Sequence, residues 1–164
     1  MASMTEAAIR PFRPDDASWL VERHATLYAR DEGFDETFGA LVAEILDAFI
    51  ADHDPSCEAG WIAHVGDRRL GSIFCVRQSE GLAKLRLFLL VPETRGQGLG
   101  QRLLDTCTGF ARAHGYSGMA LWTHESHRAA CALYARNGWR LIASKPVRSF
   151  GCDLVEQSWE IAFR

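Results

Sequence analysis

The sequence lacks several features that mark common classes of protein. It has five cysteines in 164 residues, an odd number without a Cys-x-x-Cys pair. Neither a disulfide framework nor a metal site is therefore predicted. Lysine and arginine, 18 in all, do not outnumber the 21 acidic residues, which argues against nucleic acid as a partner. No apolar run approaches the roughly 20 residues of a membrane-spanning helix, so no membrane interaction is predicted.

The first ten residues, MASMTEAAIR, lack the apolar core of a signal peptide. Together with the scattered cysteines, this predicts a cytoplasmic protein with reduced thiols. Hydrophobic residues make up 48% of the chain, enough for one globular domain over residues 1–164. No repeat, low-complexity segment or linker interrupts it, and residues 1–7 are predicted to be a flexible start.

Apolar periodicity and turn residues predict the element order β-α-α-β-β-β-α-β-α-β-β. The predicted strands cover about 9–13, 61–65, 70–77, 83–91, 119–123, 140–144 and 154–163. Two predicted helices cover about 14–30 and 128–137. A third includes the periodic apolar residues of 38–49, and a fourth follows the glycines near 98 and ends at about 114. Two strand-helix-strand units in an otherwise antiparallel run imply an α/β (α+β) fold with a mixed sheet and helices on both faces.

The segment PETRGQGLGQRLL, residues 92–104, joins a predicted strand to a predicted helix. A glycine-rich loop at a helix N-terminus binds anions, and phosphate above all, because backbone amides point out of the first turn and glycines allow close approach. A P-loop or a dinucleotide fingerprint that begins at Gly96 requires glycine at position 101. Gln101 stands there, so the sequence excludes both.

The pattern that fits is R/Q-x-x-G-x-G/A, matched by Arg95, Gly98 and Gly100. About thirty residues later the chain reads AACALYARNGW, residues 129–139. These two motifs resemble the signatures of the GNAT superfamily of N-acetyltransferases. The stretches RHATLYARDEGFDETF, AKLRLFLLVP and SFGCDLVEQSW are similar to the acetyltransferase domain of bacterial MarR–GNAT fusion proteins, of which this chain looks like a free-standing version.

The resemblance implies a mostly antiparallel sheet of about seven strands with about four helices, and acetyl-CoA as the cofactor. It implies direct attack of an amine acceptor on the thioester in a ternary complex, in a protein that can form a homodimer. Two alternatives stay open. One is a non-catalytic acyl-CoA-binding regulatory domain, and the other is an acetyltransferase acting on protein N-termini or lysines.

The same resemblance assigns the residues that bind the cofactor. Arg95 and the loop amides would hold the pyrophosphate, the backbone near Leu90 and Val91 would pair with the pantetheine arm, and Ala130 would let the arm pass. The loop residues concerned are Gly96, Gln97, Gly98, Leu99, Gly100 and Gln101. His127 stands where the superfamily often has an asparagine, and either keeps a hydrogen-bonding role or has none. Arg102 either assists the phosphates or is a solvated helix charge.

Tyr134 is the predicted proton donor to the leaving thiolate, because a phenol, with a pKa of about 10, can protonate a thiolate, whose acid has a pKa of about 8.5. The alternative is a tyrosine of the core. The family often has a carboxylate on the strand before the glycines, whereas AKLRLFLLVP contains none. Glu125, His124 and Glu32 are therefore candidates for the base that deprotonates the amine, and a water chain is the alternative.

Strand alternation places Lys84 and Arg86 on one face with Phe88 and Leu90. If this face lines the acceptor cleft, Arg86 would bind a carboxylate, and the acceptor would be a small molecule such as an amino acid or a peptide. The alternative is a pair of charges in solvent or paired with nearby acids. Four aromatic residues at element ends or in loops are candidates for pocket walls or core positions: Tyr28, Phe34, Trp122 and Phe150.

Overall fold

The computed structural model describes residues 7–163, so the predicted flexible start falls, apart from Ala7, outside the described residues. The chain forms two compact units. Among the described residues, the first contains residues 7–12, 54–119 and 163, and the second contains residues 13–53 and 120–162.

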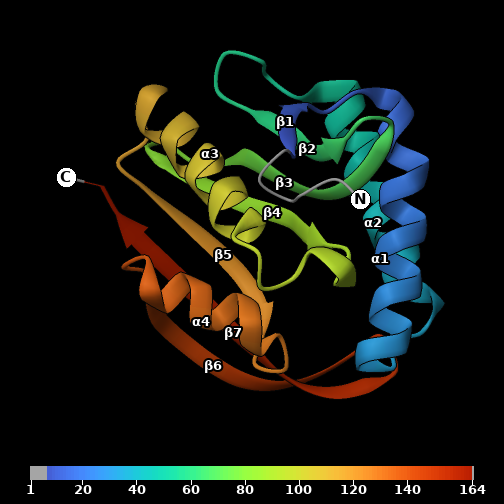
Figure 1. Cartoon of the computed structure of the whole chain (residues 1–164). Coiled ribbons are helices and arrows are strands. Elements are labelled where there is room, and N and C mark those ends of the chain that lie inside the picture. Colours follow the sequence, from blue (N-terminus) through green and yellow to red (C-terminus); the bar gives the residue numbers. More distant parts are fainter. Residues whose placement is uncertain (1–6, 164) are drawn as a thin grey trace. The chain divides into compact units, whose positions relative to one another are not determined.

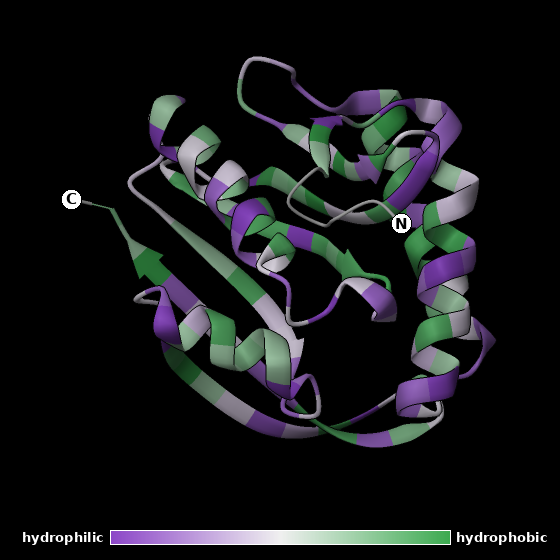
Figure 2. Ribbon diagram, viewed as in Figure 1, coloured by the Kyte–Doolittle hydropathy of each residue, from purple (hydrophilic) through white to green (hydrophobic). Residues whose placement is uncertain are grey.

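The first unit is built on antiparallel strands (Figure 1). β1 (Ala8–Pro11) pairs with β2 (Ala59–Val65), β2 with β3 (Arg68–Ser79), and β3 with β4 (Leu82–Leu90). α3 (Leu99–Ala113) packs against β3, and its buried face includes Leu103, Leu104 and Cys107. Figure 2 shows the resulting alternation of hydrophobic and hydrophilic residues along α3. The predicted amphipathic helix after the glycines is therefore confirmed.

The second unit combines helices with a long hairpin. The short 3-10 helix η2 (Pro14–Asp16) leads into α1 (Ala17–Glu32), which packs against α2 (Glu36–Asp52). Asp35 caps α2, because its Oδ1 accepts a hydrogen bond of 3.0 Å from the amide of Thr37. α4 (Arg128–Arg136) precedes β6 (Arg140–Ser149), which pairs antiparallel with β7 (Cys152–Ala162).

The strands are hydrogen-bonded in the order β1-β2-β3-β4-β5-β7-β6, with β5 spanning Gly118–His124. Within residues 7–163 this makes a seven-stranded sheet with four α-helices, which confirms the predicted fold class and element order. β6 runs to Ser149, five residues beyond the predicted end at 144. The strand continues through Pro146, because proline fits a strand at the end of the sheet, where an amide hydrogen bond is not required.

β4 contains a bulge that strand alternation did not predict. Ser72 pairs with Leu89 and Phe74 with Arg86, so two steps along β3 face three along β4. Leu87 has a φ of 50°, and its carbonyl oxygen accepts a hydrogen bond of 2.6 Å from the Ser72 hydroxyl.

The bulge changes which residues share a face of β4. Paired residues point to the same face, so Arg86 lies on the face of Leu89, whereas Leu90 pairs with Gly71 on the opposite face. The expectation that Leu90 shares the face of Arg86 is wrong, because one inserted residue reverses the alternation beyond it.

None of the helices over residues 7–163 combines the length and the apolar character that a membrane span requires.

Candidate functional site

The loop between β4 and α3 is shaped by hydrogen bonds of its own. The Thr94 hydroxyl and amide both donate to the Val91 carbonyl, at 2.8 and 3.1 Å, within the 3-10 helix η3 (Pro92–Thr94). The amide of Val91 donates to the Leu70 carbonyl at 2.9 Å. Gln97 Nε2 donates to the Glu93 carbonyl at 3.1 Å. The amide and the carbonyl of Val91 thus both have partners in the first unit. The expected backbone contact to a ligand is therefore assigned to Leu90.

The glycines of this loop adopt a conformation that L side chains rarely take. Gly96 and Gly98 have φ angles of 79° and 83°, and a Cβ added to either would meet no other heavy atom within 4 Å. Space is therefore open beside both. Arg95 lies at the rim, where a guanidinium nitrogen is 3.5 Å from the Leu90 carbonyl oxygen.

The first turn of α3 supplies the amides that an anion needs. Gly98 is the N-cap and has no side chain to cap the helix, and the ladder begins with the Arg102 amide, which donates to the Gly98 carbonyl at 3.2 Å. Helix geometry leaves the amides of Leu99 and Gly100 without an intrahelical acceptor, and the helix dipole favours negative charge beside them. The loop therefore has the form of a phosphate cradle.

Arg102 makes a long-range contact that neither expected role, phosphate binding or a solvated charge, includes. Its guanidinium donates a hydrogen bond of 2.7 Å to the carbonyl oxygen of Ala7, 95 residues earlier, and Ala7 is buried. Arg102 thus attaches the first described residue of the chain to α3.

Lys84 and Arg86 are both about half buried on β4 of the first unit. Burial lowers the pKa of Arg86 from its ordinary value, and burial together with the charge of Arg86 lowers the pKa of Lys84 to about 8. Both side chains are partly exposed, and the role of Arg86 in binding the acceptor stays a prediction.

The second unit brings together three of the predicted residues. Glu32 is the last residue of α1, Tyr28 lies one turn earlier, and His127 precedes α4. The rings of Tyr28 and His127 meet edge to face, with centroids 5.0 Å apart. His127 Nε2 lies 3.8 Å from Glu32 Oε1, and His127 Nδ1 lies 3.1 Å from the hydroxyl of Thr123.

A group of rings surrounds these residues. Tyr28 stacks on Phe38 with centroids 4.6 Å apart, Phe34 lies 4.9 Å from Phe150, and His124 lies 5.6 Å from His127. Tyr28, Phe34 and Phe150 thus belong to one aromatic cluster, and none of them lines the pocket described below. Phe38 also belongs to this group, and helical periodicity contains no signal that it would meet the ring of Tyr28.

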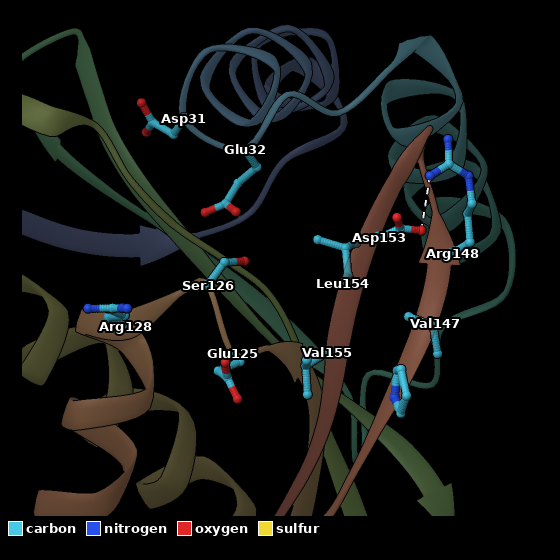
Figure 3. A pocket seen from close by; sticks show the side chains of 11 residues that line it. Asp31, Glu32, Glu125, Ser126, Arg128, Val147, Arg148, Asp153, Leu154 and Val155 are labelled. Atoms are coloured by element: carbon cyan, nitrogen blue, oxygen red, sulfur yellow. Dashed lines mark hydrogen bonds and ion pairs between the residues drawn. The ribbon is translucent and has the colours of Figure 1, made fainter.

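A pocket of about 750 Å³ opens beside Glu32 (Figure 3). Its walls come from the end of α1, the segment between β5 and α4, the start of α4 and the β6–β7 hairpin. The lining residues are Asp31, Glu32, Glu125, Ser126, Arg128, Pro146, Val147, Arg148, Asp153, Leu154 and Val155.

Acidic side chains outnumber basic ones in this lining. Asp153 pairs with Arg148 and Asp31 pairs with Arg30, each with a nitrogen–oxygen distance of 3.0 Å. Glu32 and Glu125 add two further carboxylates to the wall. The pocket therefore presents negative charge, which suits an ammonium group.

The two histidines beside the pocket are kept neutral near pH 7. Burial lowers the pKa of His127, although Glu32 raises it, and the charge of His124 lowers it further. Burial also lowers the pKa of His124, against the raising effect of Glu156 and Glu32. His127 Nε2 is buried and has no hydrogen-bond partner among residues 7–163. The dominant cause at both sites is the loss of water, which disfavours the charged imidazolium.

The remaining predicted residues lie on β5 and α4. Tyr134 is buried against Trp139 and Trp159, with ring centroids 5.6 and 6.2 Å away. Ala130 lies one turn before Tyr134 on the same side of α4. Trp122 is 44% exposed and does not line the pocket.

Comparison with known proteins identifies the family. A model described as the acetyltransferase (GNAT) family matches residues 22–139, more than half of the chain. The chain belongs to the acetyltransferase (GNAT) family. The matched range contains the glycine loop and Tyr134, and it confirms the resemblance inferred from the two motifs.

Three GNAT relatives set the scale of the similarity. N-acetyltransferase 8B of Rattus norvegicus is 29% identical over 104 residues, which cover 60% of this chain and 46% of that protein, so the match spans about half the length of this curated relative. A GNAT acetyltransferase of Staphylococcus aureus Mu50 has a TM-score of 0.77 at 18% identity, over 96% of this chain and 99% of that one.

An acetyltransferase of Salmonella typhimurium, solved with its cofactor acetyl-CoA, has a TM-score of 0.73 at 18% identity, over 95% of this chain and 93% of that one. At this level of identity, the solved structures support the GNAT fold.

Proposed function

We propose that the chain transfers an acetyl group from acetyl-CoA to a primary amine, by direct attack in a ternary complex. The observation that carries the proposal is the cradle at the start of α3, where open space beside Gly96 and Gly98 meets the amides of the first helical turn. It occurs in a member of the GNAT family, and the Salmonella relative has acetyl-CoA as its cofactor.

The residues present fit this cofactor. Arg95 and the amides from Gly96 to Gln101 would hold its pyrophosphate, the backbone at Leu90 would contact its pantetheine arm, and Ala130 would let that arm pass. When bound, the cofactor supplies an acetyl group activated as a thioester. Tyr134 would give a proton to the departing thiolate, because a phenol is the weaker acid.

A pocket of about 750 Å³ has the size of a small-molecule site, which favours a small amine acceptor over a protein N-terminus or lysine. The half-buried guanidinium of Arg86, with its lowered pKa, supports an acceptor that carries a carboxylate, because an anion offsets the cost of burying a cation. An amino acid or a short peptide would supply such a carboxylate. The predicted homodimer and the cytoplasmic location stay predictions.

The test is an acceptor screen that follows thiol release from acetyl-CoA with amino acids, dipeptides and the corresponding amides. We expect acetylation of at least one amine, and acids to be better acceptors than their amides. Arg86→Ala should raise KM for the acids and leave the amides unchanged, whereas Arg136→Ala, at an exposed position of α4, should change neither. Binding of acetyl-CoA without turnover of any amine would favour a regulatory domain instead.

A further inference from the structure

The end of α1 and the start of α4 form a line of three polar side chains. Glu32 lines the pocket, His127 lies behind Glu32 with Nε2 3.8 Å from Oε1, and Thr123 lies behind His127 with its hydroxyl 3.1 Å from Nδ1. All three residues belong to the second unit, and the line leads away from the pocket. Glu32 and His127 both keep most of their side chains buried, with 14% and 17% exposed.

The distance between Glu32 and His127 is informative. At 3.8 Å, Oε1 and Nε2 are too far apart for a good hydrogen bond, yet close enough for the carboxylate to raise the pKa of the imidazole. His127 Nε2 is a buried polar atom without a hydrogen-bond partner in the described part of the chain, and such atoms in native proteins call for an explanation. A proton that moves between the two groups provides one.

We propose that Glu32 is the catalytic base of the acceptor pocket, and that His127 is a positioning residue that receives the proton once the two atoms approach to hydrogen-bond distance. This inference rests on the proposed acetyl transfer and identifies the base for that reaction. It accounts for two departures from the family pattern noted in the sequence, the missing acid on β4 and the histidine at position 127.

The proton balance assigns a role to each end of the site. The acceptor ammonium loses one proton to Glu32, from which it passes to His127 and then to solvent. The neutral nitrogen would form a bond to the acetyl carbonyl carbon as the carbon–sulfur bond of the thioester breaks. The departing thiolate would gain a proton from Tyr134. The nitrogen would lose its second proton, and this proton would restore the Tyr134 phenol. The net products are the amide, the free thiol and one proton.

Several charged groups face this pair and set its pH dependence. Glu32 from α1 and His124 from β5 affect the pKa of His127. Glu156 from β7 affects the pKa of His124. Arg128 follows His127 directly at the start of α4. The carboxylates favour protonated imidazole and His124 opposes it, so removing Glu32 should lower the pKa of His127.

Glu125 is the competing base, because its side chain lines the same pocket. It is exposed, and its own backbone amide donates to the Val155 carbonyl at 2.9 Å. No ion pair between Glu125 and a histidine is found within residues 7–163, whereas Glu32 has His127 behind it. Comparing the two glutamates therefore separates a carboxylate backed by histidine from a carboxylate alone.

The kinetic test uses the best acceptor from the screen and measures kcat and KM between pH 6 and 10. Glu32→Gln should reduce kcat/KM by about 10²- to 10⁴-fold, the usual range for a general base. Glu44→Gln makes the same chemical change at an exposed position of α2 and should have no effect. His127→Asn, which introduces the residue that the superfamily often has, should reduce kcat more than it raises KM and move the acid limb of kcat/KM toward lower pH.

The second measurement does not depend on turnover. Imidazole NMR of the apo protein should show that His127 titrates at lower pH in Glu32→Gln than in the unmodified chain, and at unchanged pH in Glu44→Gln. The same experiment verifies that the variants are folded, from the dispersion of their other signals.

Two results would overturn the proposal: an unchanged kcat/KM in Glu32→Gln together with a large loss in Glu125→Gln, or a His127 titration that does not respond to Glu32→Gln. Failure of the unmodified chain to acetylate any amine would refute the proposed acetyl transfer instead. In that case, a His127 titration that is the same in Glu32→Gln and in the unmodified chain would still overturn the coupling between Glu32 and His127.

Discussion

His24 on α1 provides a sharp test of how burial controls protonation in this protein. The side chain is 2% exposed and lies near the rings of Tyr28 and Phe38, with centroids 5.9 and 6.2 Å away. Its Nδ1 lies 2.8 Å from the Leu20 carbonyl oxygen. Burial lowers the pKa of His24 from 6.5 to about 4, although the bond to Leu20 works in the opposite direction.

The lowered pKa makes the stability of the fold depend on pH. Between about pH 6.5 and pH 4 the unfolded chain binds a proton at His24 that the folded chain does not, so the free energy of unfolding falls as the pH falls. The shift corresponds to about 3 kcal/mol when complete, and to about 2.5 kcal/mol between pH 7.5 and pH 4.5.

The assay is urea unfolding of the unmodified chain and of His24→Asn at pH 7.5 and pH 4.5. The asparagine amide can still donate to the Leu20 carbonyl but does not titrate. We expect His24→Asn to be the less stable protein at pH 7.5, because the smaller side chain leaves a cavity, and to lose about 2.5 kcal/mol less than the unmodified chain on acidification.

His114→Asn is the matched control. Its Nδ1 also lies 2.8 Å from the carbonyl four residues earlier, that of Phe110, but the residue is exposed. Equal losses on acidification in the unmodified chain and in His24→Asn would refute the assignment of this pH dependence to His24.

Two further predictions concern glycines with positive φ. Gly151→Ala should destabilise the fold by about 1–3 kcal/mol in urea unfolding, because the new Cβ would lie 2.9 Å from Oδ2 of Asp35, the cap of α2; unchanged stability would count against that contact. Gly98→Ala should reduce the rise in melting temperature that coenzyme A produces, because alanine is strained at a φ of 83°. Gly109→Ala, inside α3 with open space around it, should keep the full rise and serves as its control.

Local sequence patterns were enough for most of the fold. Apolar spacing placed the four α-helices and seven strands in order, because helix and strand periods differ and each element buries one side. The glycine loop could also be identified from sequence, since positive φ angles and exposed helix amides depend on a few consecutive residues. Gln101 excluded a P-loop and a dinucleotide fingerprint, and the spacing of Arg95, Gly98 and Gly100 then indicated the acetyltransferase loop.

Tertiary structure decided the features that depend on residues far apart in the chain. The bulge at Leu87 is invisible in the apolar run around it, because it depends on the register with β3 and on the hydroxyl of Ser72. The contact between Glu32 and His127 joins positions 95 residues apart. Each residue was a candidate by itself, but only the packing of α1 near the start of α4 places the carboxylate 3.8 Å from the imidazole, where the charge of one can change the protonation of the other.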